Sequence, residues 1–418
     1  MCKAFTLNLL HINYIDINGS RFNGYDLCSC YRKMGHQTTQ CVWYKLSNDE
    51  NVFSLFDIPW RGYLLGLISR IEQRLSIQCL FSPFIFQLFF NKKFRKADIL
   101  HLHIIHNGFF NLFSLPLLSR LKPTVWTLHD PWALTGHCVH MYGCERWKCG
   151  CGSCPKLDSL FPMEKDRTAF MWKLKKFLYK KSELNIIVSS SWMHDLVKQS
   201  PLLSDCPVYR IPFGIDLSVF KPLDCATIRQ RLGIQPSRFV LGFRATTSEF
   251  KGLEYIRQVL DKLNVNVPIT LLTFNETGLV DQFKDRFQVI DLGWLTDEDQ
   301  TAEAINAVDI MLMPSIAESF GMMAIESMAC AKPVIAFDGT ALPETLFAPE
   351  GGVTVPSADV DSLVAVLERL IGDEEERLAL GERARQLAKD HYDFNVHAHR
   401  VMEVYVDVIK RCATIDKV

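Results

Sequence analysis

The sequence predicts an α/β protein made of two doubly wound, Rossmann-like domains. Short apolar segments alternate with helix-compatible segments along almost the whole chain, which is the pattern of buried strands in parallel sheets. The chain has 418 residues, 48% of them hydrophobic and 22% charged, so it is globular and too long for one ordinary core. Around Tyr209–Leu217 the chain leaves the first unit, and a second series of strands follows. Two domains are therefore expected.

The first domain, residues 1–212, begins with an apolar strand at Phe5–Ile12 and a turn at residues 16–21. A helix follows toward Arg32 and ends before Gly35, because glycine favours helix ends. The remaining strands of this domain are expected at Thr39–Tyr44, Ile99–His103, Thr124–Leu128 and Asn185–Ser189.

The second domain, residues 213–393, repeats the same alternation of strand and helix. A final helix is expected from about Phe394 to Arg411, within residues 394–418. The strands of the second domain are expected at Phe239–Phe243, Ile269–Phe274, Val289–Leu292, Ile310–Met313, Pro333–Phe337 and Gly352–Val355.

Charge is distributed unevenly between the two halves. Residues 1–212 carry a net charge of +11 and residues 213–418 one of −12. A basic half suits an anionic partner. Nucleic acid is not expected, because no helix-turn-helix, RNP or zinc-finger pattern is present. The preferred partner of the basic half is an anionic membrane surface or a diphosphate-linked acceptor.

The sequence also predicts a cytoplasmic protein, at most peripheral to the inner face of a membrane. Asn8, His11 and Asn13 interrupt the N-terminal apolar run, so no export signal is recognised. The longest apolar stretch, Cys79–Phe90, has 12 residues and is too short to span a bilayer. Fourteen cysteines without such a signal indicate a reducing compartment. Two aromatic and basic stretches, 84–96 and 165–181, fit either a membrane surface or ordinary amphipathic helices.

Two carboxylates, Glu318 and Glu326, stand eight positions apart around the start of a helix that is expected near Phe320. The free N–H groups of such a helix end suit anions and hydroxyls, and Gly321 lets a ligand approach the backbone. Carboxylates accept hydrogen bonds from vicinal hydroxyls, so a phosphorylated sugar fits both halves of the site. The alternative is a solvated face of an amphipathic helix.

This stretch resembles the E-x7-E motif of the retaining glycosyltransferases of family 4, whose GT-B fold has two facing Rossmann-like domains and a C-terminal helix that crosses back to the first. The resemblance implies that Glu318 and the segment Ser319, Phe320, Gly321, Met322 and Met323 contact the donor sugar, and that Glu326 contacts the ribose.

The segment Gly242–Gly252 resembles the Arg…Lys-Gly signature of the same family. Arg244 and Lys251 would neutralise the diphosphate as the bond to the leaving group breaks. An exposed Lys-Gly turn is the alternative. By the same resemblance, Gly293, Trp294 and Leu295 would pack against the nucleotide base, and residues 211–222 would form the connection between the domains.

In the first domain, His129 ends a buried strand and matches the site histidine of the family. The resemblance implies that His129 contacts the transferred sugar or stabilises the transition state, and that it does not act as a general base. Gly19 and Ser20 match a glycine-rich loop, although Asn18 stands where a second glycine is usual. A lone histidine or strand–glycine–helix turn is otherwise structural more often than not.

A cysteine-rich insertion at residues 137–156 follows His129. The C-x2-C pair Cys151 and Cys154, with Cys138 and Cys144, predicts a closed structural zinc site. Cys149 is a spare thiol, and disulfides or unliganded thiols are the alternatives. Similar insertions occur in some bacterial polysaccharide glycosyltransferases that the chain resembles. No cofactor is expected for catalysis, because the architecture lacks an Asp-x-Asp metal clamp.

The resemblance thus implies a retaining hexosyltransferase of bacterial polysaccharide or colanic-acid type. The donor would be a UDP- or GDP-sugar, and the acceptor a glycan or a polyprenyl-diphosphate-linked glycan. Two alternatives stay open. One is a nucleotide-sugar epimerase of the same architecture, and the other is a catalytically inactive scaffold of a polysaccharide assembly complex.

Overall fold

The computed structural model describes residues 6–17, 19–55 and 59–415 and divides into two compact units. The first unit is Met1–Ile211 with His397–Val418, and the second is Pro212–Val396. The sequence places these crossings at 212/213 and 393/394. The second crossing differs because one uninterrupted helix, α14 (Phe394–Ile415), begins in the second unit and continues into the first. The predicted return of the C-terminal helix to the first unit is therefore confirmed.

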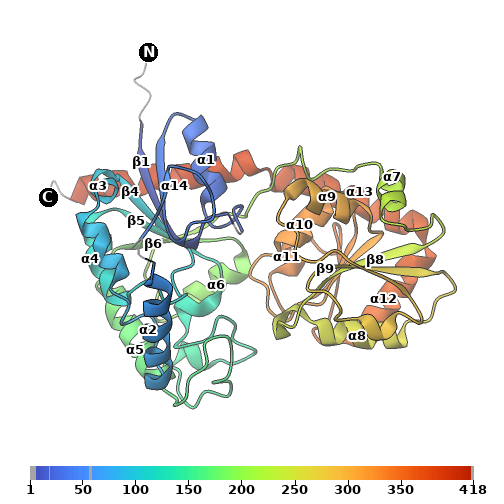
Figure 1. Cartoon of the computed structure of the whole chain (residues 1–418), viewed down its shortest axis with the longest axis horizontal. Coiled ribbons are helices and arrows are strands. Elements are labelled where there is room, and N and C mark those ends of the chain that lie inside the picture. Colours follow the sequence, from blue (N-terminus) through green and yellow to red (C-terminus); the bar gives the residue numbers. More distant parts are fainter. Residues whose placement is uncertain (1–5, 18, 56–58, 416–418) are drawn as a thin grey trace. The chain divides into compact units, whose positions relative to one another are not determined.

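A seven-stranded, all-parallel sheet forms the centre of the first unit, in the order β3-β2-β1-β4-β5-β6-β7 (Figure 1). The order reverses between β1 and β4, which makes the unit doubly wound. Its strands and helices are β1 (Asn8–Ile15), α1 (Tyr25–Lys33), β2 (Gln37–Tyr44), β3 (Val52–Ser54), α2 (Arg61–Leu75), η1 (Phe84–Phe90), α3 (Lys92–Lys96), β4 (Ile99–Leu102), η2 (Leu112–Ser114), α4 (Leu115–Leu121), β5 (Thr124–Leu128), η3 (Pro131–Leu134), η4 (Arg146–Lys148), α5 (Thr168–Lys180), β6 (Leu184–Val188), α6 (Ser191–Gln199) and β7 (Val208–Arg210).

Helices cover both faces of this sheet. Tyr405 of α14 bonds His101 of β4 on one face. Trp126 of β5 is in register with Leu102, the residue after His101, so it points to the opposite face. There it packs edge-on against Tyr179 of α5. The core therefore lies on both sides of the strands, as the continuous apolar runs predict.

The second unit repeats the topology with six parallel strands in the order β10-β9-β8-β11-β12-β13. The reversal here falls between β8 and β11. Its elements are α7 (Cys225–Arg231), β8 (Phe239–Ala245), η5 (Glu249–Lys251), α8 (Leu253–Lys262), β9 (Ile269–Asn275), η6 (Asp281–Phe283), β10 (Gln288–Asp291), α9 (Glu298–Asn306), β11 (Ile310–Met313), α10 (Met322–Ala329), β12 (Val334–Phe337), α11 (Leu342–Thr345), β13 (Val353–Val355), α12 (Val360–Gly372) and α13 (Glu374–His391).

The predicted fold class is confirmed in both units, and the predicted strands are all present with end shifts of up to three residues. The first strand begins at Asn8 instead of Phe5, which lies outside the described residues, and it continues to Ile15. The sequence missed β3 and β7, because each is a three-residue strand at an edge of the sheet.

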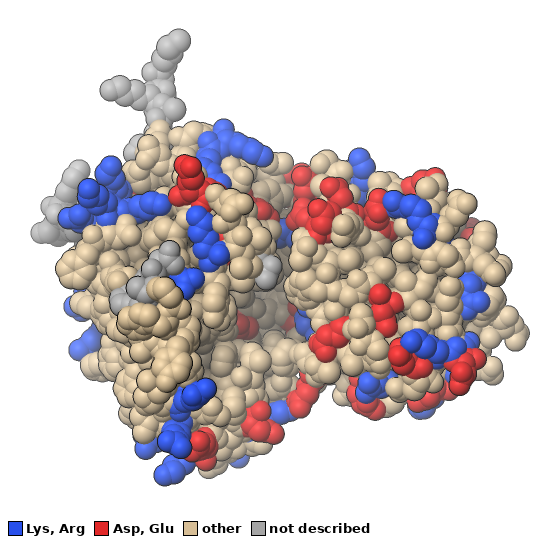
Figure 2. Space-filling model, viewed as in Figure 1, with Lys and Arg blue, Asp and Glu red and all other residues tan. Residues whose placement is uncertain are grey.

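The charges and exposed aromatic rings on the surface are relevant to the predicted anionic partners. In Figure 2, blue basic side chains spread over the first unit and red acidic side chains gather over the second. The aromatic residues of the stretches 84–96 and 165–181 divide: Phe84, Trp172 and Tyr179 are buried, whereas Phe90, Phe170 and Phe177 are exposed. Among the described residues, no helix has both the length and the hydropathy needed to cross a bilayer.

Candidate active site

In the second unit, the candidate residues meet where the strand order reverses between β8 and β11. In sheets of this kind, ligands bind at the carboxyl ends of the strands at such a point. Arg244 lies near the end of β8, Lys251 in the turn after it, and Glu318 in the loop after β11. The Lys251 Nζ atom is 2.6 Å from Glu318 Oε2, and the two side chains are only 22% and 16% exposed. The fold thus joins two residues that are 67 positions apart.

Arg244 lies close to the same carboxylates. Its guanidinium donates to Asn275 Oδ1 at 3.2 Å and lies 5.6 Å from the ring centre of Trp294. Burial lowers the pKa of Arg244, and the negative charges of Glu318, Glu326 and Glu276 act in the opposite direction. Two cations and several carboxylates therefore share one end of the sheet, an arrangement that can hold a diphosphate and hydroxyls together.

The loop between the two glutamates turns sharply at Gly321. With a φ of 101°, Gly321 is in the left-handed region, and α10 begins only at Met322. The predicted helix start at Phe320 is therefore wrong by two residues, because the left-handed Gly321 cannot belong to the helix. Glu326 lies in the second turn of α10 and is 3% exposed.

Contacts within the unit hold this loop. The Phe320 ring packs edge-on between Phe213 and Tyr392, and the Thr345 hydroxyl donates to the Phe320 carbonyl at 2.6 Å. A Cβ on Gly321 would lie 2.6 Å from a Leu342 methyl carbon. The other predicted residues of the loop differ in solvent exposure. Ser319 is buried, whereas Met322 and Met323, at the start of α10, are half-buried.

The turn after β10 carries the predicted base contacts. Gly293 has a φ of 68°, and its carbonyl accepts a hydrogen bond of 2.8 Å from the Asn275 N–H at the end of β9. Trp294 is 58% exposed, and Leu295 is half-buried. An exposed indole beside Arg244 offers a flat apolar surface, as a nucleotide base requires.

In the first unit, His129 directly follows β5. Its Nε2 atom lies 3.3 Å from His103 Nδ1, and the Phe22 ring packs against it with 5.4 Å between ring centres. Burial lowers the pKa of His129 to about 4. The ring is therefore neutral at pH 7, so it can exchange hydrogen bonds with a ligand but is a poor proton acceptor.

The predicted loop residues Gly19 and Ser20 reach this histidine only indirectly. Gly19 has a φ of 73°, and its carbonyl accepts from the Phe22 N–H at 3.1 Å. The Ser20 hydroxyl donates to Asp26 at 3.0 Å. Helix α1 starts later than the sequence suggests, at Tyr25, so neither residue caps it. Asn18 lies outside the described residues.

Sequence reasoning missed a buried group behind His129. His11 Nδ1 lies 3.0 Å from His103 Nε2, and the Tyr405 hydroxyl lies 3.3 Å from His11 Nε2 and 2.6 Å from His101 Nδ1. The ring chain therefore runs from His129 through β4 and β1 to helix α14. The one signal in the sequence is the alternation His101-Leu-His103 within an otherwise apolar strand.

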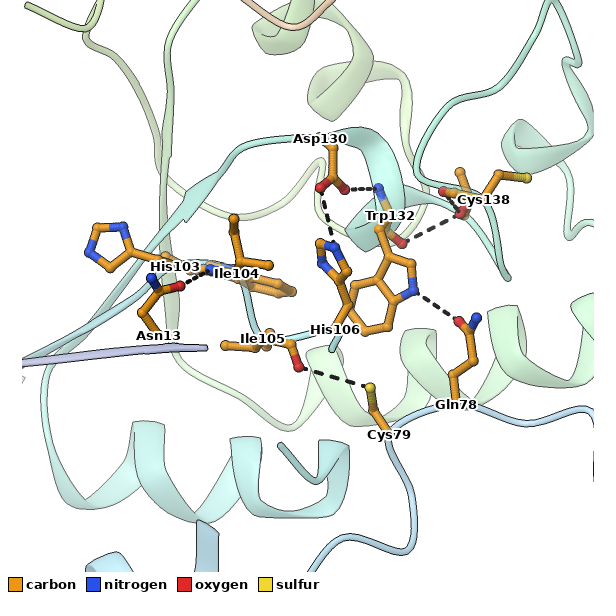
Figure 3. A network of polar contacts seen from close by, with 12 residues as sticks. Asn13, Gln78, Cys79, His103, Ile104, Ile105, His106, Asp130, Trp132 and Cys138 are labelled. Carbon is orange, nitrogen blue, oxygen red and sulfur yellow. Dashed lines mark hydrogen bonds and ion pairs between the residues drawn. The ribbon is translucent and has the colours of Figure 1, made fainter. Parts of the chain in front are cut away.

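A small pocket of about 200 Å³ opens beside His129, at the ends of β4 and β5. Figure 3 shows its polar lining: Asp130 points toward His106, at 3.5 Å, and accepts from the Trp132 N–H at 2.9 Å. The Trp132 indole donates to Gln78 at 2.9 Å. These contacts fix the chain immediately after His129.

The cysteine-rich segment lies beyond Trp132. Its four predicted ligands, Cys138, Cys144, Cys151 and Cys154, line one cavity of about 320 Å³, whereas Cys149 is exposed. Within the part of the chain that the structure describes, none of the five is in a disulfide.

Known proteins resemble both units. Residues 25–219 match the family described as Glycosyltransferase Family 4, and residues 225–387 match the family described as Glycosyl transferases group 1. The chain is 29% identical over 277 residues to a putative colanic acid biosynthesis glycosyl transferase, WcaC, of Escherichia coli, covering 64% of this chain and 66% of that protein. Matches to the curated relatives span between 36% and 66% of their lengths.

Solved structures have the same fold. Sucrose-phosphate synthase from Thermosynechococcus elongatus superposes with a TM-score of 0.68 at 17% identity, covering 97% of this chain and 100% of that one. HepE from Anabaena, solved in complex with UDP and glucose, superposes with a TM-score of 0.65 at 17% identity, covering 95% and 99%.

Proposed function

This chain belongs to the family 4 glycosyltransferases, and on that premise we propose that it transfers a sugar from a nucleoside diphosphate sugar to a hydroxyl of a glycan or lipid-linked acceptor in polysaccharide biosynthesis. The observation that carries the proposal is the pairing of Lys251 with Glu318 at 2.6 Å, beside Arg244 and Glu326. This group combines cations for a diphosphate with carboxylates for hydroxyls at one strand-end site.

In the proposed reaction, the bond between the sugar C1 and the β-phosphate oxygen breaks, and a bond from C1 to the acceptor oxygen forms on the same face of the sugar. The acceptor proton passes to the departing phosphate oxygen, so the nucleoside diphosphate leaves and the anomeric configuration is retained. Arg244 and Lys251 would stabilise the charge that develops on the leaving group. Glu318 would orient both Lys251 and the sugar hydroxyls.

The donor would be a UDP- or GDP-sugar. Glu326 would accept hydrogen bonds from the ribose hydroxyls, and residues 293–295 would face the base. HepE, which has the same fold, was solved with UDP and glucose, and this supports a nucleotide-sugar donor. The sugar would lie against residues 319–323.

His129 would contact the transferred sugar as a neutral ring. Its low pKa, which burial causes, disfavours a role as general base at neutral pH. The bond from His103 would fix which ring nitrogen of His129 carries the proton.

The acceptor side would work at the inner, cytoplasmic face of a membrane. Phe90 is 84% exposed and is followed by the exposed basic residues Lys92, Arg95 and Lys96 of α3. An exposed aromatic ring beside clustered cations suits an anionic lipid surface. A polyprenyl-diphosphate-linked acceptor would be presented there.

Two other functions are compatible with this architecture. A nucleotide-sugar epimerase would form product without an acceptor, and the comparisons do not favour it, because the relatives named above have transferase or synthase names. An inactive scaffold would keep the fold but have no use for the Lys251–Glu318 pair.

Calorimetric titration of the full chain with UDP, GDP and their common sugar conjugates tests the proposal. We expect one nucleotide to bind saturably and the variants Lys251→Ala and Glu326→Ala to bind it about 10- to 100-fold more weakly, as for the loss of a charged hydrogen bond. Lys262→Ala is the matched control, because Lys262 is an exposed lysine of α8 paired with Asp361. A folded protein that binds no nucleotide would support the scaffold instead.

A further inference from the structure

The segment between η3 and α5 is long for a compact domain. From Thr135 to Arg167 the chain contains only the short turn η4. Connections longer than about 12–15 residues without secondary structure are uncommon unless something else fixes them. Here the chain nevertheless folds back on itself, because the Gly152 N–H donates to the Thr168 hydroxyl at 2.9 Å and the Cys154 N–H to Asp166 at 2.6 Å.

The folded-back segment brings four thiols to one cavity. Cys138, Cys144, Cys151 and Cys154 all line it, and the ligand atoms of Cys138, Cys154 and His137 lie within 4.8 Å of one another. Two of the thiols come from a C-x2-C turn, in which Cys151 has the positive φ of 56°. Such turns bring the two sulfurs of a zinc knuckle to one side of the backbone.

A hydrogen-bond donor and a buried cation lie near these sulfurs. The Gly136 N–H donates to the Cys151 Sγ atom at 3.3 Å. The fully buried Lys175 ammonium donates to the carbonyls of Trp132 and Thr135, at 2.7 and 3.0 Å, and lies over the Trp132 ring. Within the described part of the chain, no carboxylate lies within ion-pair distance of Lys175. A buried cation without a carboxylate partner is costly unless another anion is near.

His137 supplies a second, independent observation. Its Nδ1 atom is buried and has no hydrogen-bond partner among the described residues, while its Nε2 atom bonds the Phe161 carbonyl. A histidine whose second nitrogen bonds a backbone carbonyl is poised to offer the first to a metal. Five donors therefore surround one cavity, which is more than a tetrahedral ion needs.

We propose that this cavity binds one structural zinc ion through the thiolates of Cys138, Cys144, Cys151 and Cys154. Each thiol gives its proton to solvent as its sulfur–zinc bond forms, so no oxidant or reductant takes part. Closed structural zinc sites also occur with three thiolates and one histidine, but four thiolates give the centre the larger negative charge beside Lys175. The dianionic centre would also provide the counter-charge for Lys175.

The zinc would act on the candidate active site through the backbone. In Figure 3, Cys138 lies beside Trp132, and Trp132 is bound to Asp130, the residue after His129. The Thr135 hydroxyl joins the two parts by donating to the Cys138 carbonyl at 2.7 Å. Loss of the ion would therefore loosen the chain that fixes the His129 end of β5, without removing any group that touches the donor.

Elemental analysis of the purified full chain tests the proposal. We expect about one zinc per chain. Replacement of the ion by cobalt should give the intense visible bands of a tetrahedral site and a sulfur-to-cobalt charge-transfer band. Cys144→Ser and Cys151→Ser should each lose the metal and lower the Tm. Cys149→Ser should keep both, because Cys149 is an exposed cysteine of the same segment outside the cavity.

Three outcomes would overturn the assignment. One is loss of zinc in His137→Ala together with its retention in Cys144→Ser, which would place the histidine in the ligand set. Another is a reduced wild-type protein that takes up no zinc or cobalt. The third is a disulfide among these cysteines, detected by thiol alkylation of the purified protein. If the serine variants do not fold, release of zinc from the wild type by a thiol-specific mercurial shows that thiolates hold the ion, and zinc that stays bound after the thiols have reacted would contradict the assignment.

Discussion

His103 and His129 are joined ring to ring, with 3.3 Å between His103 Nδ1 and His129 Nε2. The other nitrogen of His103 meets His11 at 3.0 Å, and His11 meets the Tyr405 hydroxyl at 3.3 Å. Three strands and helix α14 thus contribute to one chain of polar contacts in an apolar core. The orientation of His129, the proposed sugar contact, depends on a helix that starts 265 residues later in the sequence.

Tyr405→Phe should lower the free energy of unfolding of the first unit by about 1–3 kcal/mol, because it leaves the buried nitrogens of His101 and His11 without their partner. Tyr209→Phe is the control. Tyr209 bonds Asp407 of the same helix at 2.6 Å, but that bond is exposed. Its loss should cost less than about 1 kcal/mol. Urea unfolding measures both, and equal effects would contradict the importance of the buried chain.

Acid should destabilise the first unit well before its carboxylates titrate. Burial lowers the pKa of His11 to about 3 and of His129 to about 4, and it holds the pKa of His101 and His103 well below the usual 6.5. The unfolded chain therefore binds more protons below pH 6.5. The stability is complete above pH 6.5 and falls as the pH drops toward 4, by up to about 1.4 kcal/mol per pH unit for each histidine.

Tryptophan fluorescence can follow this unfolding selectively, because seven of the eight tryptophans lie in residues 1–212. Urea midpoints between pH 7 and pH 5 should decrease steeply. His11→Gln should make the decrease shallower, whereas His194→Gln, at a partly exposed histidine of α6, should leave it unchanged. A midpoint that is constant over this range would show that the buried histidines do not stay neutral.

Phe90→Ser should reduce binding to vesicles that contain anionic lipid, because it removes the most exposed apolar ring beside the cations of α3. Cosedimentation with anionic and with neutral vesicles measures the effect, and added salt should weaken the wild type as well. Leu378→Ser, at an exposed apolar residue of the second unit, is the control. Equal binding by all three proteins would remove membrane contact from the proposal.

Much of the architecture could be read from the sequence, because buried parallel strands are continuous apolar runs. Ile310–Met313 and Thr124–Leu128 begin and end where the sequence predicts. The edge strands β3 and β7 could not be found in this way, since three residues make too short a run. The start of α10 at Met322 required the backbone angle of Gly321, which a sequence does not reveal.

The candidate site was only partly predictable for a similar reason. Arg244, Lys251 and Glu318 belong to local motifs that resemble those of the family, so the resemblance could name them, and the structure brings them together. The histidine chain depends on contacts across large separations, such as the 394 positions between His11 and Tyr405. A histidine in a strand looks the same in the sequence whether it is bonded or not.

Gly252→Ala should disturb the donor site more than the small size of the added methyl group suggests. Gly252 has a φ of 76°, and a Cβ there would overlap the Pro314 carbonyl at the end of β11. In the native chain, the close approach of Gly252 to Pro314 aligns the turn that carries Lys251 with the loop that carries Glu318. Between these two segments, the Ile316 N–H donates to the Phe250 carbonyl at 3.0 Å. The alanine must therefore push these segments apart and separate Lys251 from Glu318.

Gly233→Ala provides a matched control, because Gly233 has a φ of 70° but no atom of the described residues lies within 4 Å of the added Cβ. The control should lose about 1–2 kcal/mol of unfolding free energy from the backbone angle alone. Gly252→Ala should lose about 1–3 kcal/mol more from the overlap. It should also bind the nucleotide more weakly, which the control should not. If the two variants behaved alike in both measurements, the close approach of the two turns would not be what positions Lys251.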